Sequence, residues 1–563
     1  MRRLLLSRLP RAAGGALCAS LALCAGLALT LAHAQDLSDA SGFTVAGTVL
    51  NAATGQPIAR AEVILNNDRA QLTGGDGSFS FDRVSAGTAA LAIHKPGYSG
   101  LGRPGGGFHR MGSNGLIEGP PRLILVGPEM PSLTFRLTPL AALSGHLILS
   151  TADPADEIRI QVFRRDLENG RYRWTLADIE KTRSDGSWRA AGLPAGRYRV
   201  EASASIDGAN DPENSDVPVW GFPALYYPGT TDVGSAGVLI LKAGQQAQAD
   251  MTLVRQRFFP VTIAVHGMPD TPTSFEIADT GGRSTGLPVH FDFRSGIAHA
   301  NVPHGSWTLT ARAFGATMRF GRTDFQVAGA PVSVAITVAP IPAIPVVIQR
   351  DFTASSDGSP RFLNGPGMSL VLAAADDFAA GGGITPLQPQ PGGESPGYEI
   401  RIFQPGNFWV ETQNFSPTYV ASVTSGGTDL ATTALTVAPG SQPAPIEVTL
   451  RDDAGTITGK VDSSSPGGGQ GPGEEPRVWV YAIPLFPTTG EVPEAQLQNN
   501  VQFSLLNLPP GSWRVVACDA PQEIDFHTQE GLAAWSGLGQ VVTVDPGGAA
   551  NVELTVIHGE VSE

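Results

Sequence analysis

The chain has 563 residues, and its 52 Asp and Glu exceed its 37 Lys and Arg, which gives a formal net charge of −15. Nucleic acid and anionic lipid are therefore poor partners, because an acidic surface repels both. Three cysteines exclude a disulfide-rich scaffold, and 68 glycines with 45 prolines indicate a chain with many turns.

The first 34 residues have the features of a secretory signal peptide. An arginine-rich start precedes an apolar run over residues 12–31, and Ala32-His33-Ala34 fits the small-residue pattern of a cleavage site. The alternative is an uncleaved anchor, because the apolar run is long. No later stretch is long and apolar enough to span a bilayer. We predict an exported protein that is periplasmic, on the cell surface or extracellular, with Cys518 as its single cysteine after cleavage.

A turn recurs five times along the rest of the chain. Each copy has an apolar residue, two residues that often include proline, and a glycine, and an aromatic ring follows two residues later in four copies. Proline restricts φ before the turn and glycine accepts an unusual φ within it, so one strand should end here and the next begin. Five occurrences indicate an internal repeat. The copies are Val84–Gly87, Leu193–Gly196, Val302–Gly305, Phe403–Gly406 and Leu508–Gly511.

Residues that alternate between apolar and polar around these turns predict β-strands, as at Phe79 and Phe81. The last strand of one repeat leads into the first strand of the next with few residues between them, for example at residues 133–149. We therefore predict an all-β chain of five abutting antiparallel β-sandwiches. After the signal peptide at 1–34, their expected bounds are 43–140, 141–256, 257–341, 342–451 and 452–558, and the third and fourth are divergent copies.

The first repeat carries a recognisable set of motifs. They are Gly47-Thr-Val, Thr54-Gly-Gln-Pro-Ile, Ala61-Glu-Val-Ile-Leu, Thr73-x-x-Asp-Gly-x-Phe and Gly97-Tyr. Over residues 43–98 this pattern resembles the carboxypeptidase regulatory-like domain, and Thr182-x-x-Asp-Gly-x-Trp is a further partial copy. The resemblance implies tandem transthyretin-like (prealbumin-like, carbohydrate-binding-like) sandwiches. It also implies an accessory domain that is not an enzyme.

Four aromatic residues lie among glycine and proline, where a strand does not require them: Trp220, Phe222, Tyr226 and Tyr227. Flat aromatic faces stack on the apolar C–H surfaces of sugars, so we predict these residues as a ligand-binding set. The alternative is that the rings cover an open end of the sandwich.

The sequence contains no convincing catalytic or metal site. His527 and Glu530 have the H-x-x-E spacing of two zinc ligands, but the only downstream candidate for the third ligand is His558. Acidic residues at 207–216 could hold calcium, although solvated charge explains them equally well. We therefore predict no catalytic residue, no metal and no cofactor.

Three functions follow from these observations. The first is a non-catalytic exported binding or scaffold protein of the cell envelope, with a polysaccharide or a cell-envelope protein as its partner. The second is a structural or adhesive spacer, which predicts an extended particle. The third and weakest is a zinc carboxypeptidase-like hydrolase centred on His527 and Glu530.

Overall fold

The computed structural model is almost entirely β-sheet, which confirms the predicted fold class. The predicted repeats are called units 1 to 5 below. The predicted signal peptide lies outside the described residues. The structure describes residues 42–101, 118–119, 121–128, 130–206, 218–267, 273–279, 281–314, 318–341, 343–353, 367–375, 387–389, 397–402, 404–414, 418–438, 440–462, 477–498 and 501–558.

Unit 1 is a sandwich of two sheets. Their strand orders are β4-β1-β9 and β3-β2-β5-β6-β7, with β8 also paired to β5. Phe79, Phe81, Leu91 and Ile93 are buried between the sheets, as their alternation predicts. The strands are β1 (Phe43–Asn51), β2 (Glu62–Leu65), β3 (Arg69–Leu72), β4 (Ser78–Val84), β5 (Gly87–His94), β6 (Gly100–Leu101), β7 (Glu118–Gly119), β8 (Arg122–Val126) and β9 (Leu133–Leu137).

Unit 2 packs the sheet β13-β10-β19, extended by β20, against the sheet β12-β11-β14-β17, extended by β18. Its core contains the repeated aromatic residue Tyr198 together with Trp188 and Phe222. The strands are β10 (Ala141–Leu149), β11 (Arg159–Glu168), β12 (Arg171–Lys181), β13 (Ser187–Leu193), β14 (Gly196–Ala202), β17 (Leu225–Tyr226), β18 (Leu239–Leu241), β19 (Gln246–Gln248) and β20 (Met251–Leu253), with a 3-10 turn at Val233–Ser235.

Unit 3 borrows strands from the segment assigned to unit 2. β15 (Ser205–Ile206) and β16 (Val219–Phe222) extend the sheet β15-β16-β21-β24-β23, in which β27 also pairs with β21. The second sheet is β22-β25-β26-β28. The sandwich therefore begins before the sequence bound predicted at residue 257. Its own strands are β21 (Gln256–His266), β22 (Thr273–Ala278), β23 (Val289–Asp292), β24 (Ile297–Pro303), β25 (Gly305–Ala313), β26 (Arg319–Val327), β27 (Val332–Thr337) and β28 (Ala339–Pro340).

Unit 4 pairs the sheet β31-β32-β29-β37-β34-β35 with the sheet β30-β33-β36. Its buried residues form a separate core cluster, to which Phe408 and Val410 of β33 belong. The strands are β29 (Ile344–Asp351), β30 (Met368–Ala374), β31 (Gln388–Pro389), β32 (Tyr398–Ile400), β33 (Gly406–Asn414), β34 (Tyr419–Ser425), β35 (Thr428–Asp429), β36 (Leu435–Val437) and β37 (Ile446–Arg451).

Unit 5 has strands in the order β40-β39-β42-β44-β38-β41, with β43 also paired to β42. A second apolar cluster packs helix α1 (Gln529–Ala534) against this sheet through Phe526 and Trp535. The strands are β38 (Gly455–Asp462), β39 (Arg477–Pro484), β40 (Glu494–Gln498), β41 (Gln502–Leu508), β42 (Gly511–Cys518), β43 (Gln540–Val544) and β44 (Ala549–Ile557).

Every unit contains parallel strand pairs as well as antiparallel ones. In each unit a strand near the start runs parallel to a strand near the end, as in β1 with β9, β21 with β27, and β38 with β44. The chain therefore leaves a unit at the pole opposite to the one at which it entered. The next unit begins there, which explains why the junctions need only a few residues.

The repeated turns share one geometry. Four of their glycines have φ between 152° and 158°, a region that side chains with a Cβ rarely adopt. Where the aromatic ring has a polar atom, that atom donates to the backbone carbonyl four residues earlier, at the proline of the turn. These bonds are Tyr198 Oη to Pro194 O (2.6 Å), Trp307 Nε1 to Pro303 O (3.0 Å) and Trp513 Nε1 to Pro509 O (3.1 Å).

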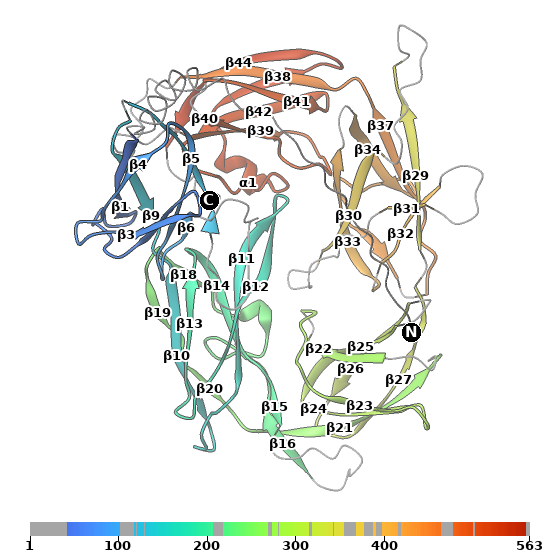
Figure 1. The fold of residues 1–563 in the computed structure, drawn as a ribbon. Coiled ribbons are helices and arrows are strands. Elements are labelled where there is room, and N and C mark those ends of the chain that lie inside the picture. The colour runs from blue at the N-terminus through green and yellow to red at the C-terminus, as the bar shows by residue number, and fades with distance from the viewer. Residues whose placement is uncertain are drawn as a thin grey trace, which may run out of the picture.

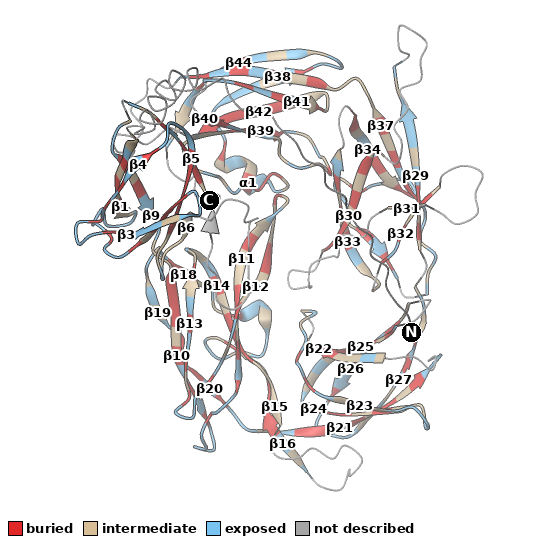
Figure 2. Cartoon of the chain, viewed as in Figure 1, coloured by how far each residue is buried: buried red, intermediate tan, exposed pale blue. Residues whose placement is uncertain are grey.

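The five units follow a curve and not a straight line. Figure 1 shows that unit 5, in orange and red, returns to lie beside the β11–β12 hairpin of unit 2. Figure 2 shows that buried residues run along the strands of every unit, so each unit has a core of its own. Polar side chains make several of the contacts between units, as described next.

Candidate functional site

The predicted aromatic set is divided between surface and interior. Trp220 is 41% exposed on β16, and the Arg255 guanidinium lies 5.2 Å from its ring centroid. Phe222 and Tyr226 are 4% and 2% exposed, and Tyr227 is half-buried against the core of unit 2. Trp220 and Phe222 lie on strand β16 and Tyr226 lies on strand β17. As a ligand-binding set the four residues stay a prediction, and Trp220 is the one with an accessible ring.

The H-x-x-E pair does not assemble a zinc site. His527 is half-buried beside the Phe526 ring, and partial burial lowers its pKa to about 4. His558 contacts Asp519 through Nδ1 at 2.9 Å. Within the described residues no three His, Cys, Asp or Glu form a group that could hold a metal ion. The acidic segment proposed for calcium, 207–216, lies outside the described part of the chain.

Cys518 is fully buried in the second cluster of unit 5. Burial raises the pKa of its thiol to about 12, and the nearby Asp519 carboxylate contributes. A protonated, inaccessible thiol is chemically inert.

The long β11–β12 hairpin of unit 2 lies on the inner side of the curve that the five units follow (Figure 1). β11 and β12 are joined by Asn169 and Gly170, whose φ values of 50° and 72° suit a two-residue hairpin turn of type I′. The Asn169 side chain donates to Glu411 Oε2 of unit 4 at 2.6 Å. On the other side of the tip, Gly170 lies against the Phe526 ring of unit 5. The hairpin therefore joins three units that are far apart in sequence.

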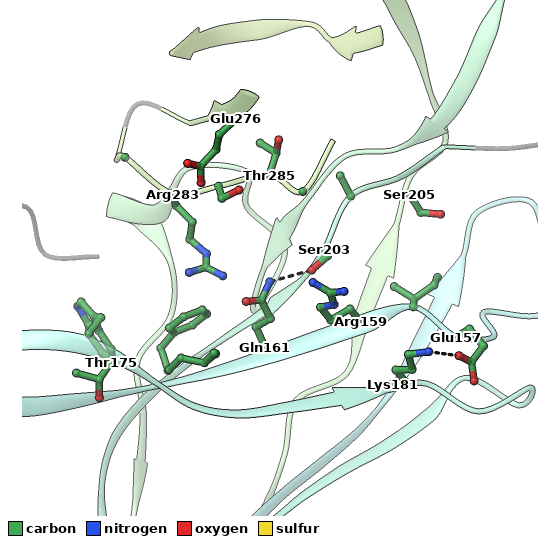
Figure 3. A pocket seen from close by; sticks show the side chains of 18 of the residues that line it. Glu157, Arg159, Gln161, Thr175, Lys181, Ser203, Ser205, Glu276, Arg283 and Thr285 are labelled. Atoms are coloured by element: carbon green, nitrogen blue, oxygen red, sulfur yellow. Dashed lines mark hydrogen bonds and ion pairs between the residues drawn. The ribbon is translucent and has the colours of Figure 1, made fainter. Parts of the chain in front are cut away.

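A cleft of about 900 Å³ lies between this hairpin and unit 3. Figure 3 shows Arg159, Gln161 and Thr175 on the hairpin side, and Glu276, Arg283 and Thr285 on the side of unit 3. Gln161 Nε2 donates to Ser203 Oγ at 3.0 Å, which holds the amide in place in the cleft wall. Lys181 and Glu157 form an ion pair among the lining residues. The lining thus combines hydroxyl, amide and charged groups, with Trp174 and Phe163 as aromatic members.

A buried ion pair fixes the two units that form the cleft. The Arg283 guanidinium contacts the carboxylate of Glu201, which is 1% exposed, and lies 3.8 Å from the Phe163 ring centroid. Burial raises the pKa of Glu201, and the charge of Arg283 opposes that shift. Tyr226 Oη donates to Asp279 Oδ2 at 3.0 Å across the same junction. Units 2 and 3 are therefore joined by a specific polar network as well as by strand pairing.

No sequence pattern indicates this cleft. Its walls come from residues near 160, 203 and 280, which are brought together by the fold of unit 2 against unit 3. Taken alone, each of these three segments has the mixture of polar and apolar residues that is typical of an ordinary exposed strand. The one recognisable local feature is the Asn169-Gly170 pair between two alternating segments, which is a strong hairpin signal.

No family model matches this sequence, and no curated protein matches it. Among solved structures, the TIE protein of Bacillus anthracis is 10% identical, and the match covers 92% of this chain and 69% of that one with a TM-score of 0.13. The shaft pilin SpaA of Lactobacillus rhamnosus GG is 10% identical over 37% of this chain and 100% of that one, with a TM-score of 0.14. GBS52, the minor pilin of Streptococcus agalactiae, is 12% identical over 36% and 97%, with a TM-score of 0.17.

TM-scores this far below 0.5 carry no conclusion about the function of this chain. The resemblance to the carboxypeptidase regulatory-like domain is matched by no family model and stays a prediction. Among the described residues, no helix is long and apolar enough to cross a membrane.

Proposed function

We propose that this chain is a non-catalytic, exported binding protein of the cell envelope, and that the cleft between units 2 and 3 takes a polyhydroxylated ligand. A saccharide is the class that fits best. The observation that supports this proposal is the cleft itself, whose volume of about 900 Å³ lies within the range of ligand pockets. The predicted signal peptide supports export, and the resemblance to the carboxypeptidase regulatory-like domain supports a role without catalysis.

The chemistry of the lining favours sugar hydroxyls over an apolar ligand. A hydroxyl both donates and accepts, so it pairs well with amides, guanidinium groups and carboxylates placed side by side. Gln161, Arg159 and Glu276 supply one of each. Trp174 is 8% exposed and the Arg199 guanidinium lies 4.4 Å from its ring centroid, so it contributes to the cleft wall and not to a stacking surface.

A structural or adhesive role is the second candidate, and the contacts between units favour it. Thr412 N donates to Thr489 O at 2.8 Å between units 4 and 5, and the hairpin tip joins both units to unit 2. These contacts oppose a straight rod but are compatible with a rigid, curved scaffold. Such a scaffold and a ligand cleft do not exclude each other.

The test is a binding screen of neutral and cell-wall oligosaccharides against the exported chain by isothermal titration calorimetry. Arg159→Ala and Gln161→Ala should weaken a hit at least about tenfold if the cleft holds it. Arg189→Ala is the matched control, because Arg189 is exposed on β13 and lies outside the cleft lining.

Trp220→Ala separates the cleft from the aromatic site predicted from the sequence. Binding that is lost only in Trp220→Ala would place the ligand on β16 and refute the cleft. If no oligosaccharide binds, the saccharide proposal fails and the scaffold role stands alone.

A further inference from the structure

Arginine side chains of the β11–β12 hairpin and of the neighbouring strand β14 gather opposite units 4 and 5. Arg165, Arg171, Arg173 and Arg197 line a cavity of about 490 Å³ together with Trp409 of unit 4 and residues of unit 5. A neighbouring cavity of about 550 Å³ shares Arg165, Tyr172, Arg197 and Asp525 with it and adds Arg164. The two form one groove, called the arginine groove here.

The positive charge of this groove contrasts with the rest of the chain. The two cavities together have five arginines against three carboxylates, Glu523, Asp525 and Glu530, whereas the chain carries a net charge of −15. Two of the arginines have acidic neighbours, because Arg164 pairs with Asp166 and Arg173 lies 3.7 Å from Glu411. Asp525 is engaged locally, since its side chain accepts from Thr528 Oγ1 at 2.5 Å and from His527 N at 3.1 Å. At physiological ionic strength charges act over roughly 8 Å, so Arg165, Arg171 and Arg197 are little affected by the acids elsewhere on the chain.

Two of the arginines are held in place by aromatic rings. The Arg171 guanidinium lies 3.6 Å from the Trp409 ring centroid, and that of Arg165 lies 4.3 Å from the Tyr172 centroid. Stacking fixes the plane of a guanidinium while its N–H groups stay directed outward from its edge. Burial lowers the pKa of Arg171 to about 10, which still leaves it positively charged at neutral pH.

Two buried arginine nitrogens of the groove, Arg164 Nε and Arg173 Nη2, lack a hydrogen-bond acceptor among the described residues. Arg173 is 7% exposed, and its Nη2 has no hydrogen-bond partner among the described residues. Glu411 Oε1 lies 3.7 Å from it, which is an ion-pair distance beyond hydrogen-bond reach. A buried N–H without an acceptor is costly, and an oxyanion in the groove would supply one.

We infer that the arginine groove is a second binding site, distinct from the proposed cleft, for a ligand that carries carboxylate or phosphate groups. Guanidinium groups bind both oxyanions through paired N–H···O bonds. Because the groove is lined by units 2, 4 and 5, it exists only while the hairpin tip is docked on units 4 and 5.

The test measures binding of three probes to the exported chain at low and at physiological salt. The probes are an oligogalacturonate, the same oligomer with its carboxylates methyl-esterified, and inorganic phosphate. Binding of the oligogalacturonate or of phosphate, without binding of the ester, supports the site and tells the two oxyanions apart. If neither anion binds at low salt, or if the ester binds equally well, the proposal is overturned.

Variants locate the binding. Arg165→Gln and Arg197→Gln should each weaken it at least about tenfold, since both residues line the two cavities. Arg197 is exposed and Arg165 only half-buried, so neither change should prevent folding. Arg189→Gln is the control, and an equal loss in all three variants would overturn the proposal. Failure here leaves the saccharide cleft untouched, because Arg165 and Arg197 do not line it.

Discussion

The docking of the hairpin tip depends on one glycine. Gly170 has a φ of +72°, and a Cβ placed on it would lie 2.3 Å from Cε1 and 2.4 Å from Cδ1 of the Phe526 ring. Carbon atoms that are not bonded do not approach so closely, and their best separation is roughly 3.5–4.0 Å. Gly170→Ala should therefore strain the backbone and also force the hairpin away from unit 5.

The two effects can be given magnitudes. A left-handed conformation costs a residue with a Cβ about 1–2 kcal/mol, and overpacking costs about 1–3 kcal/mol. Together they amount to about 2–5 kcal/mol if the contact is kept. Each unit has its own core, so the least costly relief is to open the contact between units 2 and 5. We expect Gly170→Ala to open the curve and increase the radius of gyration.

Small-angle scattering measures the opening, and thermal unfolding measures the stability. The matched control is Gly427→Ala, because Gly427 has a φ of +80° and a Cβ added to it would have no other atom within 4 Å, so only backbone strain is added. In a variant that already carries Phe526→Ala, the clash with the ring is absent. Gly170→Ala should then lower the stability by no more than Gly427→Ala does. The reasoning is refuted if both glycine variants have equal stability and Gly170→Ala leaves the scattering curve unchanged.

Three further predictions concern titratable groups that are buried or half-buried. Burial, with a smaller contribution from Arg171, lowers the pKa of His527 from 6.5 to about 4. The unfolded chain is therefore protonated at a higher pH than the folded chain, and stability should fall as pH drops from about 6.5 to 4. His527→Gln should flatten that fall, by up to about 3 kcal/mol, and equal slopes of melting temperature against pH would contradict this. The thiol of Cys518 should resist a thiol reagent at pH 8 until the chain unfolds, and rapid labelling of the native protein would argue against its burial. Arg283→Met should destabilise the chain by about 3–5 kcal/mol in chemical denaturation, because it leaves Glu201 buried and unpaired, and adding Glu201→Gln should recover part of the loss. Unchanged stability in Arg283→Met would contradict the importance of that pair.

The local parts of the fold were predictable because their causes are local. The Thr-x-x-Asp-Gly motif is an example, since Thr73 Oγ1 donates to Ile58 O at 2.6 Å and Thr182 Oγ1 accepts from Ile158 N at 3.0 Å. Asp76 accepts from Ser78, which closes the turn and lowers the pKa of the carboxyl. These residues are explained by structure alone, without a ligand.

The arrangement of the units was not predictable from the same patterns. Asn169 and Glu411 are separated by 242 positions, and nothing in either segment indicates the other. The strand Val219–Phe222 was missed because four residues are too short to show an alternation, and its pairing with β21 is set by the neighbouring unit. The parallel pairing of first and last strands leaves no mark in a single strand, since alternation is the same in either direction.

The hairpin also relates the two proposed sites to each other. Arg173 lines both the cleft and the arginine groove, because its strand β12 lies between the two cavities. Only the groove, however, includes residues of units 4 and 5, whereas the far wall of the cleft belongs to unit 3 and is fixed by Arg283 and Glu201. Gly170→Ala should therefore abolish anion binding in the groove and leave binding in the cleft nearly intact. Loss of both would mean that the hairpin itself had unfolded, and loss of neither would mean that the docked tip is not what forms the groove.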